Sequence, residues 1–129
     1  MSACDLQGET LSDFLVNLEA DFEVIDGSEV IYSEPSFPVV ELARELARWI
    51  PQGEAQASDF WFSSLSFEDA GAVRILRREA GWTVGSVFMP ETQSTPISWG
   101  ELLVCIEEFL ASVRRDVTEL GLSLDLVGL

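Results

Sequence analysis

The most constraining feature of the sequence is a long, capped amphipathic helix near its C-terminal end. Ser98 and Glu101 form an S-x-x-E capping box, and Ile97 and Leu102 are placed for a hydrophobic staple. Gly121 supplies a C-terminal stop. Between these signals, apolar residues recur at steps of three and four, at Leu103, Ile106, Leu110, Val113, Val117 and Leu120. This spacing predicts about six turns of helix with one apolar face.

The N-terminal part alternates apolar and polar residues with the period of a β-strand. Residues 13–25 place apolar side chains on one face, at Phe14, Val16, Leu18, Ala20, Phe22 and Val24. The Asp-Gly pair at 26–27 indicates a turn before a second strand over 30–33. We expect a three-residue turn, because it sets Val30 and Tyr32 on the apolar face of the first strand.

A second amphipathic helix is predicted after Pro38, a residue that is tolerated early in a helix. Apolar residues follow at helical spacing, at Val39, Leu42, Ala43, Leu46, Ala47 and Ile50. Pro51 and Gly53 indicate its end, and residues 59–66 are expected to begin a second group of strands.

The best strand pair in the sequence is a hairpin of residues 72–78 and 82–89. We expect it to place Leu76 opposite Val84. Residues 90–96 are expected to form a loop that leads to the long helix.

Strand pairs separated by single helices, without strict β-α-β alternation, are typical of the α+β class. We predict a single domain over residues 1–129, with an antiparallel sheet of about five strands and two main helices packed on one face. Residues 1–10 are expected to form a flexible or loosely packed N-terminal tail. Cys4 in this tail and Cys105 in the long helix are expected to be free thiols in a reducing cytoplasm.

The net charge of the chain is −16, from 23 acidic and 7 basic residues among 129. All the basic residues are arginines, a composition that points toward bacteria. Such a charge repels nucleic acid and anionic membranes and attracts basic proteins. Because no signal peptide or membrane-spanning run is evident, we expect a cytoplasmic protein, with a monomer favoured over an oligomer.

The residue types needed for most catalysis are missing. The chain has no histidine, which removes the commonest general base and most zinc sites. It has no lysine, and therefore no P-loop, and no G-x-G-x-x-G or G-x-S-x-G motif. Residues 21–34 fail the EF-hand pattern because Ile25 stands where a ligand is needed. We therefore expect a protein that is not an enzyme and that has no cofactor or metal.

Carboxylate pairs remain at Glu107–Glu108 and Glu68–Asp69. Adjacent helical residues point about 100° apart, so the first pair is expected to be solvated. The only basic cluster is expected to neutralise neighbouring carboxylates rather than bind phosphate; it comprises Arg74, Arg77 and Arg78. Most of the tryptophans are expected in the core or at its edge: Trp49, Trp61, Trp82 and Trp99.

Acidic residues are concentrated at the start of the chain, where ten of them and no basic residue precede Arg44. Glu19, Asp21 and Glu23 would stand in a row on one strand face, about 7 Å apart, where like charges repel. A charge run of this kind is either a solvated face or a surface for a basic partner. On the second interpretation, the partner-binding residues are Asp13, Glu19, Asp21, Glu23, Asp26, Glu29 and Glu34.

In size, acidity, lack of catalytic residues and α+β pattern, the sequence resembles the small immunity proteins that neutralise bacterial toxins, many of them nucleases. The stretches FPVVELA at 37–43, with Trp49 after it, and GWTVGSVF at 81–88 also look like an uncharacterised bacterial domain family. The first resemblance implies a cognate toxin domain as the basic protein partner. It also implies inhibition by covering the active cleft of the toxin.

Three other classes stay open at this point. A nucleic-acid mimic that inhibits a nuclease would use the same charge, but spread over most of its surface. An acidic adaptor or secretion chaperone would expose an apolar groove and dimerise through the long C-terminal helix that begins after Ser98. An enzyme that uses only carboxylates has no constellation of residues in its favour.

Overall fold

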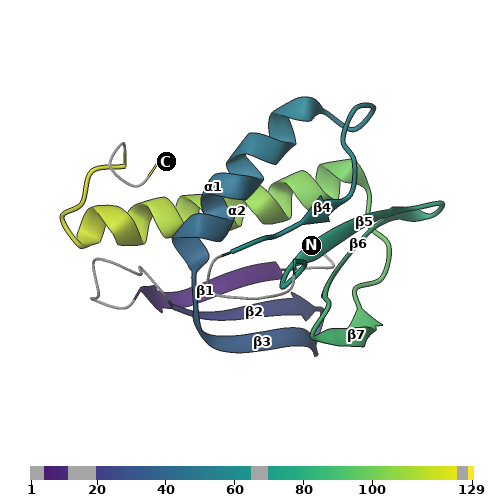
Figure 1. Cartoon of the computed structure of the whole chain (residues 1–129), viewed down its shortest axis with the longest axis horizontal. Helices are drawn as coiled ribbons and strands as arrows, with labels where there is room; N and C mark the ends of the chain where they lie inside the picture. Colours follow the sequence, from purple (N-terminus) through teal and green to yellow (C-terminus); the bar gives the residue numbers. More distant parts are fainter. Residues whose placement is uncertain (1–4, 12–19, 65–69, 125–127) are drawn as a thin grey trace.

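A computed structural model of the chain describes residues 5–11, 20–64, 70–124 and 128–129 (Figure 1). Along these residues the elements follow in the order β1 (Asp5–Leu11), β2 (Ala20–Asp26), β3 (Glu29–Phe37), α1 (Val39–Trp49), a 3-10 turn (Ile50–Gln52), β4 (Phe60–Trp61), β5 (Arg74–Arg78), β6 (Gly81–Ser86), β7 (Met89–Gln93) and α2 (Trp99–Glu119).

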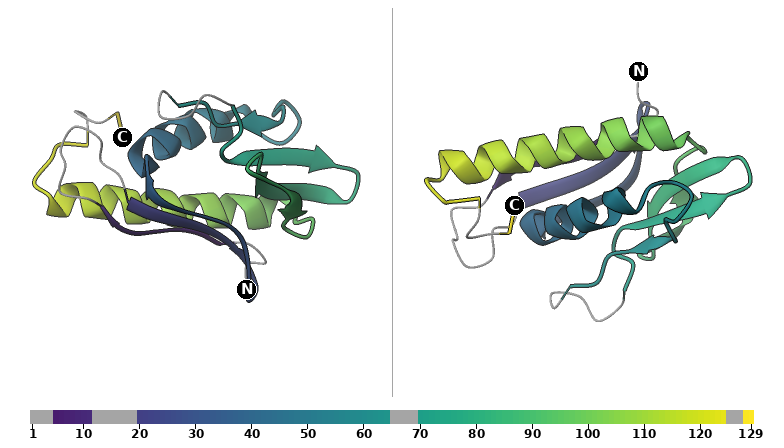
Figure 2. Two further views of the ribbon diagram at one scale, coloured as in Figure 1. Left: turned by 60° about the horizontal axis from the view of Figure 1, so that its bottom comes forward. Right: turned by 90° about the horizontal axis from the view of Figure 1, so that it is seen from above.

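The described strands form two antiparallel sheets, in place of the one sheet of about five strands that we expected. The first sheet has the order β1-β2-β3, and the second has the order β4-β5-β6-β7. Helix α2 contacts β1, and α1 lies beside α2 on the same side of the first sheet (Figures 1 and 2). The predicted α+β class, with its two main helices, is confirmed.

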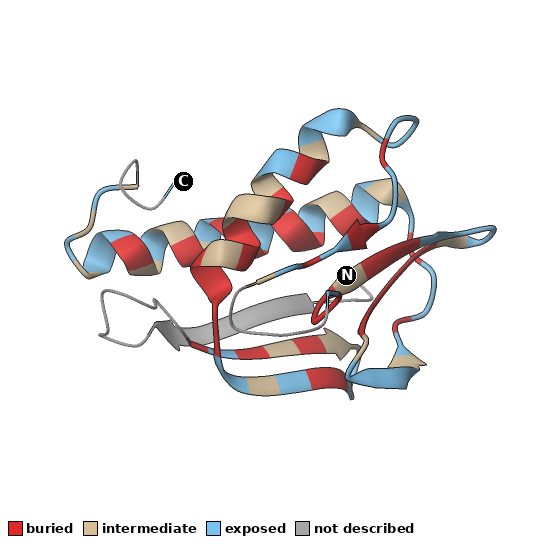
Figure 3. Ribbon diagram, in the orientation of Figure 1, coloured by how far each residue is buried: buried red, intermediate tan, exposed pale blue. Residues whose placement is uncertain are grey.

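Helix α2 packs on the first sheet through aromatic rings. Phe22 of β2 stacks on Phe37 of β3, with ring centroids 4.6 Å apart, and meets the edge of Phe109 of α2 at 5.8 Å. Ala20, Phe22 and Val24 are all buried, as the period-two pattern predicts (Figure 3). The predicted strand is thus confirmed over 20–25, whereas residues 13–19 lie outside the described part of the chain.

Three tryptophans join α1, the second sheet and α2. Ring centroids of Trp49, Trp82 and Trp99 lie between 5.2 and 5.6 Å from one another. The Trp49 indole donates to the carbonyl of Ser58 at 3.0 Å. These three residues are core or core-edge, as expected, but Trp61 is 46% exposed.

The predicted long helix is present as α2, and its capping box forms as expected. The Ser98 hydroxyl accepts the Glu101 backbone N–H at 3.1 Å, and the Glu101 carboxylate accepts the Ser98 N–H at 3.3 Å. Gly121, which follows the C-cap residue Leu120, has a left-handed backbone with a φ of +80° and ends the helix as predicted. The apolar face is buried through Leu102, Cys105, Ile106, Phe109, Leu110, Val113 and Val117.

Two segments that we expected to be irregular are strands. Residues 5–10, part of the expected tail, lie in β1, which pairs with β2. Residues 90–93, part of an expected loop, lie in β7, which pairs with β6. Pro90 led us to predict a loop here, but a proline is compatible with a strand at the edge of a sheet, and β7 is the last strand of the second sheet.

The turns of both central hairpins are shorter than predicted. In β5–β6, Arg78 pairs with Gly81 across a two-residue turn, so Val84 lies opposite Ile75 and not opposite Leu76. A register shift of one residue follows directly from the loss of one turn residue.

In β2–β3, Asp26 pairs with Glu29, which also leaves two residues in the turn. A β-bulge between the Val24–Tyr32 and Ile25–Val30 pairs then inserts Ile31. Ile31 and Tyr32 are buried, whereas Val30 is 49% exposed and does not face the core as predicted.

Candidate partner-binding surface

The outer face of the first sheet carries the outward side chains of β2. Asp21 is exposed and Glu23 is half-buried, in alternation with the buried Ala20, Phe22 and Val24. Helices α1 and α2 lie on one side of this sheet (Figure 1). Phe22 meets Phe109 of α2 on that side, so strand alternation places Asp21 and Glu23 on the opposite side. We call the side of β2 that carries Asp21 and Glu23 the acidic face.

The other predicted site residues do not share one role. Asp13 and Glu19 lie outside the described residues. Asp26 Oδ2 accepts the Thr95 backbone N–H at 2.7 Å and the Thr95 hydroxyl at 3.1 Å. Asp26 therefore ties the β2–β3 turn to the segment that precedes α2. Glu29, opposite Asp26 in the ladder, is exposed.

Glu34 lies beside a groove at the edge of β3. The Tyr32 hydroxyl donates to Glu34 Oε1 at 3.2 Å. Burial raises the pKa of Tyr32 above its ordinary value, and the charge of Glu34 acts in the same direction, so Tyr32 remains a donor at neutral pH. The groove has a volume of about 360 Å³ and is lined by Val30, Ile31, Tyr32, Ser33, Glu34, Phe88 and Met89.

The negative charge of the first sheet is not compensated by basic residues of its own strands. No arginine or lysine precedes Arg44, so none of β1, β2 and β3 contains one. Within the described part of the chain, the only ion pair joins Arg48 to Glu45 on α1, at 3.1 Å. The acidic face can therefore attract a cationic surface of another molecule.

We expected the arginine cluster on β5 to neutralise neighbouring carboxylates. Arg77 donates from its guanidinium to the Glu54 carbonyl at 2.8 Å and lies 5.1 Å over the Trp82 ring. Arg74 lies 5.8 Å over the Trp61 ring. Among the described residues, Arg74 and Arg77 contact carbonyls and aromatic rings and form no ion pair with a carboxylate. Glu68 and Asp69 lie outside the described residues, so the predicted neutralisation stays a prediction.

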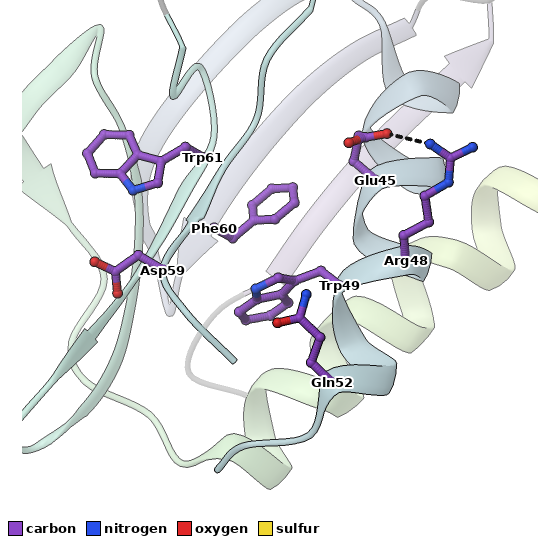
Figure 4. Close-up of a pocket in the computed structure, with 7 residues that line it drawn as sticks. All are labelled: Glu45, Arg48, Trp49, Gln52, Asp59, Phe60 and Trp61. Atoms are coloured by element: carbon purple, nitrogen blue, oxygen red, sulfur yellow. Dashed lines mark hydrogen bonds and ion pairs between the residues drawn. The ribbon is translucent and has the colours of Figure 1, made fainter. Parts of the chain in front are cut away.

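A second pocket, of about 260 Å³, lies between the end of α1 and β4 (Figure 4). Its charged rim is engaged within the chain, because Arg48 pairs with Glu45 and Asp59 accepts the Arg77 backbone N–H at 2.8 Å. No sequence pattern indicated this pocket. Its lining residues are Glu45, Arg48, Trp49, Gln52, Asp59, Phe60 and Trp61.

The remaining candidates offer little chemistry. Glu107 and Glu108 are exposed on α2, and Glu68 and Asp69 lie outside the described residues. Where the structure describes the chain, no three acidic or cysteine side chains are grouped so that they could hold a metal ion. Cys105 is buried in α2. No described helix is both long and apolar enough to span a bilayer.

A family model matches residues 3–119, which include all the strands and both helices that the structure describes. The chain belongs to the DUF7878 family. The family is described as a domain of unknown function, and neither the curated proteins nor the solved structures contain a match to the chain. The acidic face and the groove beside β3 both lie within the residues that the family model matches.

Proposed function

We propose that this DUF7878 domain is a binding protein that engages a basic protein through its acidic face. The observation that carries the proposal is the pair Asp21 and Glu23, which alternate with the buried residues of β2 and so lie on the side of the sheet away from the helices. No basic residue stands on the same sheet. We further propose that the partner is a cognate bacterial toxin, and that the domain is an immunity protein that covers the active cleft of that toxin.

Repulsion between the carboxylates of the acidic face makes its complex with a cationic partner more favourable than the unbound state. Carboxylates two positions apart on a strand are about 7 Å apart and repel each other by roughly 0.6 kcal/mol in water. A cationic partner removes this repulsion and is steered toward the face by the field of the whole chain. Toxins that act on nucleic acids have basic clefts, which an acidic sheet face complements in charge.

The test begins with recovery of the partner from the host by the tagged chain, at low and at high salt. The recovered protein is then measured against a double variant, Asp21→Lys with Glu23→Lys. A matched control is Glu107→Lys with Glu108→Lys, because these exposed residues lie on α2 and give the same change in net charge. We expect the Asp21 and Glu23 variant to lower the association rate roughly tenfold or more at low salt, because it removes electrostatic steering by this face. The Glu107 and Glu108 control should lower the rate much less.

Two outcomes would overturn the proposal. The first is an equal loss of association rate for both variants, which would mean that only net charge matters. The second is an unchanged rate for the Asp21 and Glu23 variant. The immunity function in particular fails if the recovered partner keeps its toxic activity when saturated with the chain.

A further inference from the structure

The groove beside β3 lies along the edge of the strand. It is lined by five consecutive residues, 30–34, together with Phe88 and Met89 from the β6–β7 connection. These residues lie on both sides of the bulge at Ile31, and the opposite wall comes from the β6–β7 connection, so the cavity lies where the edge of β3 faces that connection. We call this cavity, of about 360 Å³, the β3 groove.

The outer edge of β3 forms no second strand ladder in the described part of the chain, and β6 and β7 pack beside it. Within the described part of the chain, β3 is the last strand in the order β1-β2-β3 and pairs only with β2. The outer edge of such a strand presents unpaired N–H and C=O groups, which are a template for another extended chain. A peptide added there would gain main-chain hydrogen bonds and would place alternate side chains in the groove.

The walls of the groove combine apolar surface with one carboxylate. Val30, Phe88 and Met89 are each at least 41% exposed, although all three are large and apolar. The ring of Phe88 lies 6.3 Å from the buried ring of Tyr32. The Tyr32 hydroxyl fixes the carboxylate of Glu34 in the groove lining. This wall fits an apolar side chain next to a basic one.

We propose that the β3 groove binds an extended segment of the basic partner as an added β-strand, with a basic side chain against Glu34 and an apolar side chain among Val30, Phe88 and Met89. The inference rests on the proposed function, because charge complementarity selects the occupant. It deepens that function by naming a second contact, since β3 lies directly beside β2 and its acidic face.

Charge also argues against a second copy of the chain as the occupant. An antiparallel pairing of two β3 edges would join two strands that each carry Glu29 and Glu34 and no basic residue, in a chain that carries a net charge of −16. Like charges directly opposite each other destabilise a strand pair. A basic segment has the reverse effect.

The probe is a labelled peptide of alternating arginine and valine, followed by fluorescence anisotropy. A second peptide has the same sequence with alternate backbone amides methylated, which keeps its charge but removes strand pairing. The protein variants are Val30→Lys and, as a control, Val104→Lys on α2, since these valines are 49% and 51% exposed. We expect Val30→Lys and backbone methylation each to weaken binding about tenfold, and Val104→Lys to change it less than about twofold.

Further measurements separate the remaining possibilities. Glu34→Gln, which keeps the shape of the side chain, should weaken the arginine peptide but not a glutamine–valine peptide. Equal binding of the methylated peptide, or equal effects of Val30→Lys and Val104→Lys, would overturn the added strand while the acidic face could still bind. Loss of a dimer in Val30→Lys by light scattering would identify a second copy as the occupant and refute the proposal.

Discussion

The β2–β3 and β5–β6 hairpins use their charged residues in opposite ways. On β5, the Arg77 guanidinium is bound to the Glu54 carbonyl and lies over Trp82, so its charge is part of the packing of the second sheet. On β2, Asp21 and Glu23 face away from both helices, and their sheet contains no basic residue. Charge is therefore part of the internal packing in one hairpin, whereas in the other it lies on the outer face of the sheet, where we propose that a partner binds.

The two hairpins also differ in how closely other atoms surround their turn glycines. The largest predicted loss of stability follows from this difference. Gly81 has a φ of +141°, and an added Cβ would lie 2.6 Å from the Ile97 carbonyl oxygen. That carbonyl is held by the Trp82 N–H at 2.8 Å, so it cannot easily move. We expect Gly81→Ala to lower the free energy of unfolding by about 3 kcal/mol, as strained backbone and overpacking together predict.

Gly27, in the β2–β3 turn, is the matched control for this change. Its φ is +64°, but an added Cβ would meet nothing within 4 Å. Gly27→Ala should therefore cost only the left-handed backbone penalty, about 1 kcal/mol. Urea denaturation of both variants measures the difference, and equal losses would mean that the β5–β6 turn is not packed against Ile97.

The second prediction separates the acidic residues of the first hairpin from one another. Asp26 accepts two hydrogen bonds from Thr95, whereas Asp21 is exposed on the acidic face. We expect Asp26→Ala to lower the free energy of unfolding by about 2 kcal/mol, and Asp21→Ala to change it by less than about 0.5 kcal/mol. Thermal and urea unfolding provide the measurement.

Asp26→Asn sharpens this test because it keeps an acceptor oxygen while removing the charge. It should retain most of the stability that Asp26→Ala loses. A large loss in Asp26→Asn would instead assign the effect to the charge. A large loss in Asp21→Ala would show that the acidic face stabilises the fold, contrary to its proposed role as a surface for a partner.

The features that could be predicted from sequence are those with local causes. The capping box of Ser98 and Glu101 lies within one helical turn, so its geometry needs no tertiary information. The alternation around Phe22 likewise predicts which side of β2 is buried. The split into two sheets and the register of β5–β6 depend on contacts and turn geometry that propensity does not encode, such as the approach of Ile97 to Gly81.

The candidate site divides in the same way. The outward positions of Asp21 and Glu23 follow from strand period alone. The bond between Asp26 and Thr95 joins residues 69 positions apart, and no sequence pattern indicates it. The bulge at Ile31 and the meeting of β3 with Phe88 and Met89 are equally non-local, which is why the β3 groove could not be foreseen.

The smallest predicted effect is a loss of stability at high pH that comes from the first hairpin. Tyr32 is the only tyrosine in the chain. Burial raises its pKa above the ordinary value of 10.0, the charge of Glu34 adds to this effect, and a hydrogen bond with Ser86 opposes it. Below pH 10 the hydroxyl is protonated in both states. Above pH 10 the unfolded chain releases this proton while the folded chain retains it, so stability falls as pH rises toward the folded pKa.

At pH 11 this linkage should lower the free energy of unfolding by about 1.4 kcal/mol relative to pH 9. Urea unfolding across that range measures the loss, and Tyr32→Phe should remove it, because phenylalanine does not titrate. Absorbance near 295 nm follows the same group directly, since no other tyrosine contributes. An ordinary absorbance titration near pH 10 in the folded protein would mean that the Tyr32 hydroxyl is solvated. In that case the bond to Glu34 would not organise the β3 groove.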